Sequence, residues 1–212
     1  MSKKTLETTA KVNKTDKIIA QARKENRKAL LETEAKTICM EYGISVPKFQ
    51  VATNEKEAAK ISEEIGYPIV AKIVSPEIIH KSDAGGVKVN LKNAQEVSEA
   101  YKTIIANAKK FNEKANIVGV LIQEMAPSGT EVIIGAIKDP QFGQTVMFGL
   151  GGIFVEVLKD VTFKVAPITI EEAKEMITSL KAYPLLKGYR NTPAADIEAL
   201  AKNLVNVSKL VM

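Results

Sequence analysis

The chain has 212 residues, of which 45% are hydrophobic and 26% are charged, so it is long enough to bury a substantial core. No apolar run approaches the roughly 20 residues that a membrane-spanning helix needs, and the charged N-terminal segment contains no apolar signal-peptide stretch. The single cysteine, Cys39, excludes an internal disulfide, and this favours a cytoplasmic protein.

The net charge of +5 could suggest a nucleic-acid partner, but it is concentrated at one end. Residues 1–36 contain ten Lys or Arg and five Asp or Glu, which is the whole excess. Aromatic residues make up only 5% of the chain and Trp is absent, so basic and aromatic side chains do not alternate as a stacking platform requires. We therefore interpret residues 1–24 as a basic N-terminal extension and expect no nucleic-acid binding.

Helix-period and strand-period patterns alternate along the first part of the chain. The start signals are Asn54 followed by Glu57 and Asn93 followed by Glu96, each of which resembles a capping box. The elements expected here are a helix over 17–42, a strand over 48–52, a helix from 54 to 66, a buried strand over 69–74, a strand over 86–91 and a helix from 93 to about 111.

A second block of strands and helices follows near residue 123. Residues 126–129 (APSG) are expected to join two strands as a hairpin, and Asp139-Pro140 marks a further turn. The elements expected in this block are strands over 117–125, 130–138, 145–158 and 161–168 and helices over about 170–182 and 193–211. The pattern predicts an α/β or α+β protein in two lobes, one over 25–122 and one over 123–212.

The segment HKSDAGGV, residues 80–87, is the first candidate site. The adjacent Gly85 and Gly86 would let backbone N–H groups approach a ligand, and Lys81 adds a positive charge, a combination that suits a polyphosphate. The segment is neither a Walker A motif nor a dinucleotide fingerprint, and an ordinary turn is the alternative. His80, the chain's one histidine, could act as acid, base or nucleophile, or could be a plain loop residue.

Three further stretches carry charge in apolar surroundings. Lys72 interrupts the apolar run IVAKIV, and it is either a phosphate clamp or an edge-strand lysine whose ammonium reaches water. Glu124 and Met125 end one strand, where they could meet an adenine edge, and Glu131 begins the next, where it could bind ribose or face solvent.

A second glycine cluster lies in GLGGIFVE, residues 149–156. Glu156 follows these glycines on what the pattern predicts to be an apolar strand, which indicates either a ligand-lined turn or a β-bulge. Lys164, on the apolar strand after it, is another candidate anion contact.

Five stretches together resemble the ATP-grasp β subunits of ADP-forming acetyl-CoA (acyl-CoA) synthetases. They span roughly residues 27–200 and occur in the family's order. The stretches are EAKTICMEYGISVPKFQVATNEKEA, GYPIVAKIVSPEIIHKSDAGGVKVNL, QEMAPSGTEVIIGAIKDPQFG, MFGLGGIFVEVLKDVTFKVAPI, and LLKGYR with PAADI.

The resemblance implies an α+β ATP-grasp fold, in which two α/β lobes enclose a nucleotide cleft. It implies an acid-thiol ligase that converts acyl-CoA, ADP and phosphate reversibly into acid, CoA and ATP, with ATP/ADP and Mg²⁺ as cofactors. A CoA-binding α subunit, in an α2β2-type hetero-oligomer, would supply acyl-CoA and phosphate.

The resemblance also assigns roles to residues. His80 matches a proposed second phosphoryl carrier, and Glu156 lies in a loop near the metal. The residues it implies for the nucleotide are Lys72, Ser75, Gly85, Gly86, Val87, Glu124, Met125, Glu131, Gly151, Gly152 and Lys164.

Two features differ from the family's pattern. The family ends with a block resembling D-x-N-P that holds magnesium, and this sequence stops at SKLVM, short of it. Asn191 stands where a glycine is expected after Arg190. Two other functions remain open: a nucleotide-sensing domain without chemistry, as in modules fused to acetyltransferases, and a stand-alone ATP-grasp carboxylate ligase with Arg190 as its only candidate carboxylate clamp.

Overall fold

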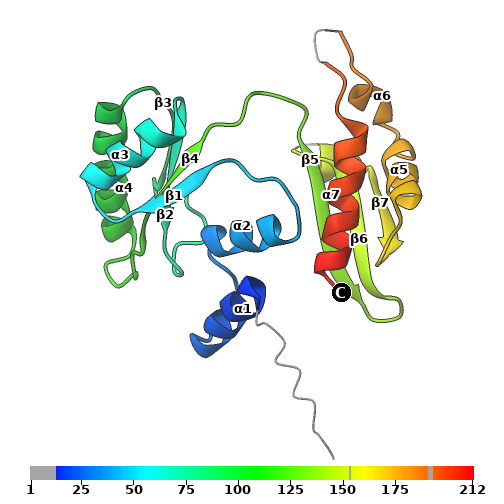
Figure 1. Ribbon diagram of the computed structural model, residues 1–212, viewed down its shortest axis with the longest axis horizontal. Helices are drawn as coiled ribbons and strands as arrows, with labels where there is room; N and C mark the ends of the chain where they lie inside the picture. Colours follow the sequence, from blue (N-terminus) through cyan, green and yellow to red (C-terminus); the bar gives the residue numbers. More distant parts are fainter. Residues whose placement is uncertain (1–12, 153, 191–192) are drawn as a thin grey trace, which may run out of the picture. The chain divides into compact units, whose positions relative to one another are not determined.

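The computed structural model describes residues 13–152, 154–190 and 193–212, and the chain forms two compact units (Figure 1). The first unit takes in the described residues up to Glu41 together with Val46–Ala126, and the second takes in Tyr42–Ser45 and Pro127–Met212. The boundary expected at residue 123 falls inside a strand of the first unit, and the division follows Ala126 instead. No helix among the described residues is long and apolar enough to cross a membrane.

The first unit is built on an antiparallel sheet of four strands in the order β1-β4-β2-β3. Helices α3 and α4 pack against each other and against one face of this sheet (Figure 1). The bounds are β1 Phe49–Ala52, α3 Glu55–Ile65, β2 Ile69–Val74, β3 Val87–Leu91, α4 Ala94–Phe111 and β4 Gly119–Glu124. All six elements were predicted from the sequence, and they are confirmed to within two residues at nearly every end.

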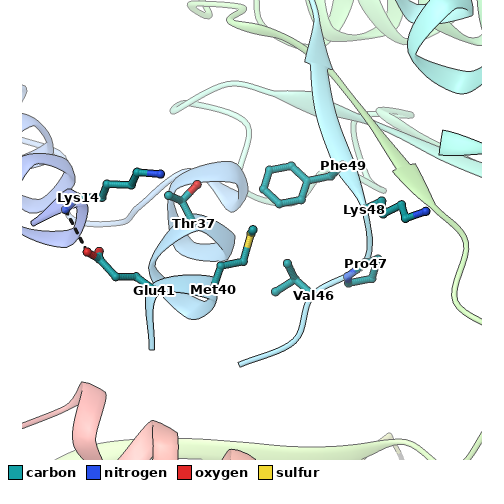
Figure 2. A pocket seen from close by; sticks show the side chains of 8 residues that line it. All are labelled: Lys14, Thr37, Met40, Glu41, Val46, Pro47, Lys48 and Phe49. Atoms are coloured by element: carbon teal, nitrogen blue, oxygen red, sulfur yellow. Dashed lines mark hydrogen bonds between the residues drawn. The ribbon is translucent and has the colours of Figure 1, made fainter. Parts of the chain in front are cut away.

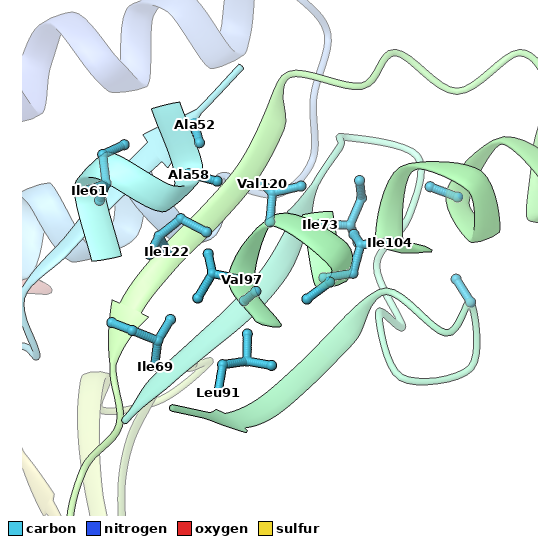
Figure 3. Close-up of a cluster of buried hydrophobic side chains, with 14 of the residues drawn as sticks. Ala52, Ala58, Ile61, Ile69, Ile73, Leu91, Val97, Ile104, Val120 and Ile122 are labelled. Atoms are coloured by element: carbon cyan, nitrogen blue, oxygen red, sulfur yellow. The ribbon is translucent and has the colours of Figure 1, made fainter. Parts of the chain in front are cut away.

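Alternation along β2 separates a core face from a polar one. The side chains of Ile69, Ala71 and Ile73 are buried in the cluster that the strands share with α3 and α4 (Figure 3). Lys72 therefore belongs to the opposite face, because successive side chains of a strand point to opposite sides. The helix that covers this second face is α2 (Glu32–Glu41), which hydrogen-bonds Lys72 through Glu32.

Asparagine caps begin both long helices as expected. The side-chain oxygen of Asn54 accepts a hydrogen bond from the backbone N–H of Glu57 at 2.9 Å, and Asn93 accepts one from Glu96 at 2.9 Å. Each cap satisfies one of the N–H groups that the first turn of a helix leaves without a partner.

The single helix expected over 17–42 is wrong, because the chain forms two helices there. Helix α1 (Lys14–Lys24) ends with Glu25 as its C-cap, and α2 begins at Glu32. Asn26 takes a left-handed backbone conformation with φ of 53°, which cannot continue a right-handed helix. The apolar spacing was helical on both sides of the break, so periodicity alone did not reveal it.

One set of polar contacts ties the loop after α1 to α2, and a second ties α1 itself to α2. The guanidinium of Arg27 donates to both carboxylate oxygens of Glu34 at 2.8 and 2.7 Å. At the other end, Glu41 accepts hydrogen bonds from the hydroxyl of Thr15 at 2.6 Å and from its N–H at 2.8 Å. The Thr15 hydroxyl bond, supported by backbone N–H groups, lowers the pKa of the Glu41 carboxyl.

The second unit is a three-stranded antiparallel sheet in the order β5-β6-β7, packed against α5 and α7. Its elements are β5 Val132–Asp139, β6 Gly143–Leu150, the π-helix η1 Phe154–Leu158, β7 Val161–Val165, α5 Ile170–Thr178, α6 Tyr183–Leu186 and α7 Ile197–Leu210. The strand expected over 145–158 is therefore only half right, because it ends at Leu150 and a π-helix follows two glycines. The helix expected over 170–182 ends at Thr178.

The hairpin expected at residues 126–129 is also wrong. Strand β4 lies inside the first sheet, where β1 and β2 pair with its two edges, so no edge remains for β5. Strand β5 pairs with β6 in the other unit. The segment is thus a connection between units, although its turn-forming composition resembles that of a hairpin loop.

The two faces of the second sheet differ. On one face, Val146, Phe148 and Leu150 of β6 are buried beneath α5 and α7. On the other, Ile137 and Phe163 are 56% and 52% exposed. The helices therefore cover only one side of this sheet.

The loop between β2 and β3 ends in two tightly packed glycines. Gly85 has φ of +60°, a conformation that other residues adopt at a cost. A Cβ on Gly86 would lie 2.5 Å from Cγ2 of Ile73 and 3.0 Å from the carbonyl oxygen of Lys81. The fold itself therefore requires glycine at both positions.

The contact between Glu41 and Thr15 predicts a pH-dependent stability. A carboxylate whose pKa is lowered by folding stabilises the protein above its unfolded pKa, and this contribution is lost as the pH falls through the folded pKa. We expect Glu41→Gln to lower the free energy of unfolding at neutral pH, and the deficit relative to wild type to shrink below about pH 4. Urea denaturation at the two pH values measures this. Glu63→Gln, on exposed α3 surface, is the control, and an equal deficit at both pH values would contradict the prediction.

Gly86→Ala tests the packing of the glycine loop. The added methyl group has no room beside Ile73, so we expect the free energy of unfolding to fall by about 1–3 kcal/mol, as overpacking typically does. Gly129→Ala is the matched control, since a Cβ there meets no atom within 4 Å. If Gly86→Ala were as stable as Gly129→Ala in urea denaturation, the packing argument would be wrong.

Candidate functional site

Three lysines of the first unit converge on one carboxylate. The Nζ atom of Lys72 donates a hydrogen bond to Oε1 of Glu32 at 2.8 Å. Lys36, one turn further along α2, has its Nζ 3.6 Å from the same oxygen, and Lys81 has its Nζ 3.5 Å from Oε2. We call these four residues the lysine cluster.

The lysine cluster is partly buried. The side chains of its four members are between 15% and 25% exposed. Lys36 is the most enclosed, because its Nζ also donates to Oε1 of Gln123 at 2.7 Å and lies 5.6 Å from the centre of the Phe49 ring. Gln123 is a buried residue on β4, so the cluster rests directly on the sheet.

The charges of the cluster do not balance. Within the described residues, Glu32 is the one acidic side chain within 4.0 Å of these three ammonium groups, which leaves two positive charges unmatched. Burial would raise the pKa of Glu32, but the hydrogen bond from Lys72 and the charges of the three lysines outweigh it, so that the pKa is lowered. Burial lowers the pKa of Lys36 despite the charge of Glu32. A partly buried excess of positive charge attracts an anion, and a polyphosphate fits this requirement.

Of the residues predicted from the sequence, Lys72 and Val87 are brought together here, because they face each other in the register of β2 and β3. Ser75 lies next to the strand end, and its buried hydroxyl donates to Glu77 at 3.0 Å. His80 is exposed in the loop directly before Lys81. Its side chain is therefore accessible, one position before a lysine of the cluster in the sequence.

The glycine loop does not offer its amides as the sequence suggested. The N–H of Gly85 donates to the carbonyl oxygen of Ser82 at 3.0 Å, and that of Gly86 donates to Lys81 at 2.8 Å. Asn107 on α4 also donates to the carbonyl oxygen of Gly85 at 3.0 Å. Both glycine N–H groups are thus used within the turn, and the loop's contribution to anion binding here is the side chain of Lys81.

Glu124 and Met125 lie at the end of β4, close to the start of β1. The N–H of Glu124 donates to the carbonyl oxygen of Lys48 at 2.9 Å, and that of Met125 donates to Pro68 at 3.1 Å. The carboxylate of Glu124 accepts a hydrogen bond from the N–H of Lys48 at 3.2 Å. Both N–H groups are therefore already bonded within the protein. An adenine edge at this position would have to bind other groups of the segment.

In the second unit, the structure brings Glu131 together with Gly151 and Gly152. The N–H of Gly151 donates to the carbonyl oxygen of Glu131 at 2.8 Å, and a Cβ on Gly151 would lie 3.0 Å from that of Glu131. Gly152 has φ of +60°, and a Cβ built there would lie 3.8 Å from Oε2 of Glu131. The glycines therefore allow the backbone after β6 to lie against Glu131, and the ligand-lined turn predicted from the glycine cluster stays a prediction.

Lys164 is not part of that group. Its register partner on β6 is Val146, so it lies on the sheet face that the helices cover. There its Nζ pairs with Glu175, which raises the pKa of the lysine, and lies 3.7 Å from Glu172. Lys164 was predicted to contact the anion of a ligand, and in the structure its ammonium is paired with acidic residues of α5 instead.

The metal assignment concerns Glu156, and the described residues do not test it. The side chain of Glu156 lies outside them, as does Asn191. In the part of the chain that the structure covers, no three His, Cys, Asp or Glu side chains are grouped so that they could hold a metal ion. We therefore derive no step through magnesium from this chain.

A hollow of about 760 Å³ lies beside α2, and none of the site residues predicted from the sequence lines it (Figure 2). Figure 2 shows apolar side chains, among them Met40, Val46 and Phe49, around it, with Glu41 bonded to the backbone of Lys14 at its edge. It holds no cluster of charges comparable to the three lysines, so the lysine cluster remains the candidate site.

Sequence reasoning named Lys72 and Lys81 but missed Glu32, Lys36 and Gln123. A signal for the first two was present, because a Glu and a Lys four residues apart lie on the same face of a helix. Gln123 directly follows the apolar run IVGVLI and precedes the charged Glu124. The contacts between these residues join segments as much as 87 positions apart, and no local pattern contains that information.

Comparison with known proteins places this geometry in a family. The family described as "ATP-grasp domain" matches residues 21–212. The chain is 58% identical to the protein named "Acetate--CoA ligase [ADP-forming] I subunit beta" of Pyrococcus furiosus, over 95% of this chain and 87% of the relative. It is 51% identical to the corresponding II subunit beta of the same organism, over 92% and 83%.

Solved structures agree. One of Ca. Korarchaeum cryptofilum dinucleotide forming acetyl-coenzyme A synthetase 1, in complex with coenzyme A, Ca-AMPCP and HgCl⁺, matches with a TM-score of 0.89 and 49% identity, covering 93% of this chain and 86% of that one. Another structure of that protein, with Mg-AMPPCP and a phosphohistidine segment pointing towards the nucleotide binding site, gives a TM-score of 0.82 and 46% identity, covering 93% and 85%. The chain therefore belongs to the ATP-grasp family and, within it, to the β subunits of ADP-forming acetate–CoA ligases.

Proposed function

We propose that this chain is the nucleotide-binding β subunit of an ADP-forming acyl-CoA ligase, an acid-thiol ligase that interconverts acyl-CoA, ADP and phosphate with acid, CoA and ATP. The observation that carries the proposal is the lysine cluster, which presents two unmatched positive charges on the face of a sheet. Its support comes from the 58% identity to a β subunit of that name.

The lysine cluster would hold the phosphates of the nucleotide. Lys72 and Lys36 are anchored on a strand and a helix, so their ammonium groups are held in place before a ligand arrives. In phosphoryl transfer, most of the catalytic effect comes from positioning and from offsetting the charge on the transferred group. For the second unit by itself, Glu131, Gly151 and Gly152 are the residues that we propose for ribose and phosphate contacts.

His80 would act as the phosphoryl carrier. Its imidazole nitrogen attacks the phosphorus of an incoming phosphoryl donor, so that a P–N bond forms as the bond to the donor's leaving atom breaks. A terminal oxygen of ADP then attacks the same phosphorus, which breaks the P–N bond, forms ATP and restores the imidazole. The exposure of His80 and the position of Lys81 next to it support this role.

A CoA-binding α subunit would be the partner, in an α2β2-type assembly, and acyl-CoA and phosphate would enter through it. The relatives' designation as "subunit beta" supports a second subunit. The single cysteine and the intracellular nucleotide substrates support the cytoplasm as the location.

Replacing Lys72 tests the phosphate site. Lys72→Met keeps most of the aliphatic stem but removes the ammonium, and a hydrogen bond to a charged group is worth about 1.5–3 kcal/mol, so we expect the Kd for ADP to rise by about tenfold or more. Isothermal titration calorimetry measures it. Lys102→Met, an exposed lysine that pairs with Glu55, is the matched control. Unchanged ADP affinity in Lys72→Met would show that phosphate binds elsewhere.

The carrier role is tested in the complete assembly with its α subunit. Supplied with acyl-CoA and phosphate, it should acquire a phosphoryl group on His80, detectable by mass spectrometry under alkaline conditions. We expect His80→Ala to keep ADP binding but to form no ATP. Normal turnover in His80→Ala would end the carrier proposal, and ADP binding without any transfer in the wild-type assembly would indicate a nucleotide sensor.

A further inference from the structure

Glu32 is the one member of the lysine cluster whose charge has the wrong sign for holding phosphate. We propose that Glu32 is a positioning residue: its carboxylate gathers Lys36, Lys72 and Lys81 and keeps the enclosed Lys36 protonated, so that the three lysines together can meet the phosphates of a nucleotide. This inference rests on the proposed function, and it assigns a task to a residue that does not itself touch the ligand.

The three lysines come from separate parts of the chain, and Glu32 is what they share. Lys36 lies on α2, Lys72 in the middle of β2, and Lys81 in the loop after it. Each has its Nζ between 2.8 and 3.6 Å from an oxygen of Glu32. Both carboxylate oxygens are used, since Oε1 faces Lys36 and Lys72 and Oε2 faces Lys81. One carboxylate thereby joins a helix, a strand and a loop.

Without this carboxylate, three like charges would be left together at a partly buried place. Like charges at short distance disfavour the charged form of each group, and burial disfavours it further. Lys81 sits on a loop and could turn away to water, whereas Lys36 is held by Gln123 and by the Phe49 ring. Lys36 is therefore the group most prone to lose its proton.

The charged and titratable groups that act on Lys36 are Glu32, Lys72 and the thiol of Cys39. Burial lowers the pKa of Lys36 most, Glu32 raises it, and Lys72 lowers it again. Removing the charge of Glu32 takes away the main opposing effect, so Lys36 would become neutral at a lower pH. A neutral amine no longer offsets phosphate charge, and nucleotide affinity would decline with it.

The test is the pH dependence of ADP binding in the full-length chain, measured by calorimetry between about pH 7.5 and 9.5, above the range in which phosphate groups titrate. Glu32→Gln keeps the shape of the side chain and removes its charge. We expect its Kd for ADP to rise over this range by about tenfold more than that of wild type, the equivalent of one pKa unit in a group that must be charged. If Glu32 had a purely structural role, Glu32→Gln would weaken ADP binding equally at both ends of this pH range.

Glu34→Gln is the matched control, since it lies on the same helix and pairs with Arg27 instead of the three lysines. Its pH profile should follow that of wild type. Glu32→Asp keeps the charge on a shorter side chain, so its pH profile should lie between those of wild type and Glu32→Gln. It replaces Glu32→Gln in the test if that variant fails to fold.

Three results would overturn the inference. Profiles of Glu32→Gln, or of Glu32→Asp in its place, that run parallel to wild type would show that Glu32 does not control the charge of Lys36. Tighter ADP binding at every pH would show that Glu32 competes with phosphate rather than preparing its site. If wild type bound no ADP, the proposed function itself would fail and this inference with it; in the first two cases the proposed function would stand.

Discussion

The carboxylate of Glu32 is the contact on which the candidate site depends. Near a protein surface, opposite charges about 4 Å apart attract by about 4 kcal/mol at an effective dielectric of 20, and like charges repel by the same amount. Three lysines that meet at one place therefore need a shared counter-ion, and Glu32 is in contact with each of them. One carboxylate cannot neutralise three ammonium groups, so the cluster remains positive. That residual charge is what makes it a place for an anion.

The fold supplies the convergence through the alternation of β2. Ile69, Ala71 and Ile73 enter the core beneath α3 and α4, and this fixes the orientation of the strand. Lys72, between them in sequence, is then directed to the face that α2 covers. A shift of one residue in register would bury the lysine and expose the isoleucines. The hydrophobic core and the position of the charge are therefore set by the same pairing.

The glycines near His80 illustrate how a binding motif and a packing requirement can look alike in sequence. Gly85 and Gly86 were read as a cradle for phosphate, but their N–H groups close the turn and their missing Cβ atoms leave room for Asn107 and Ile73. Their contribution to the site is indirect, because the tight turn holds Lys81 within reach of Glu32. Gly151 likewise uses its N–H within the chain, where it donates to the carbonyl oxygen of Glu131, and a Cβ there would lie against the same residue.

The sequence by itself determined most of the helices and strands, the asparagine caps at Asn54 and Asn93, and the family. These features rest on local spacing or on motifs, which a linear pattern contains. Tertiary structure alone decided that residues 126–129 connect two units, that Lys164 pairs with α5, and that Glu32 joins lysines from three segments. Each of these depends on which edge or face an element presents to a distant partner. Spacing along the chain does not specify that choice, because it is made by burial and pairing across the whole unit.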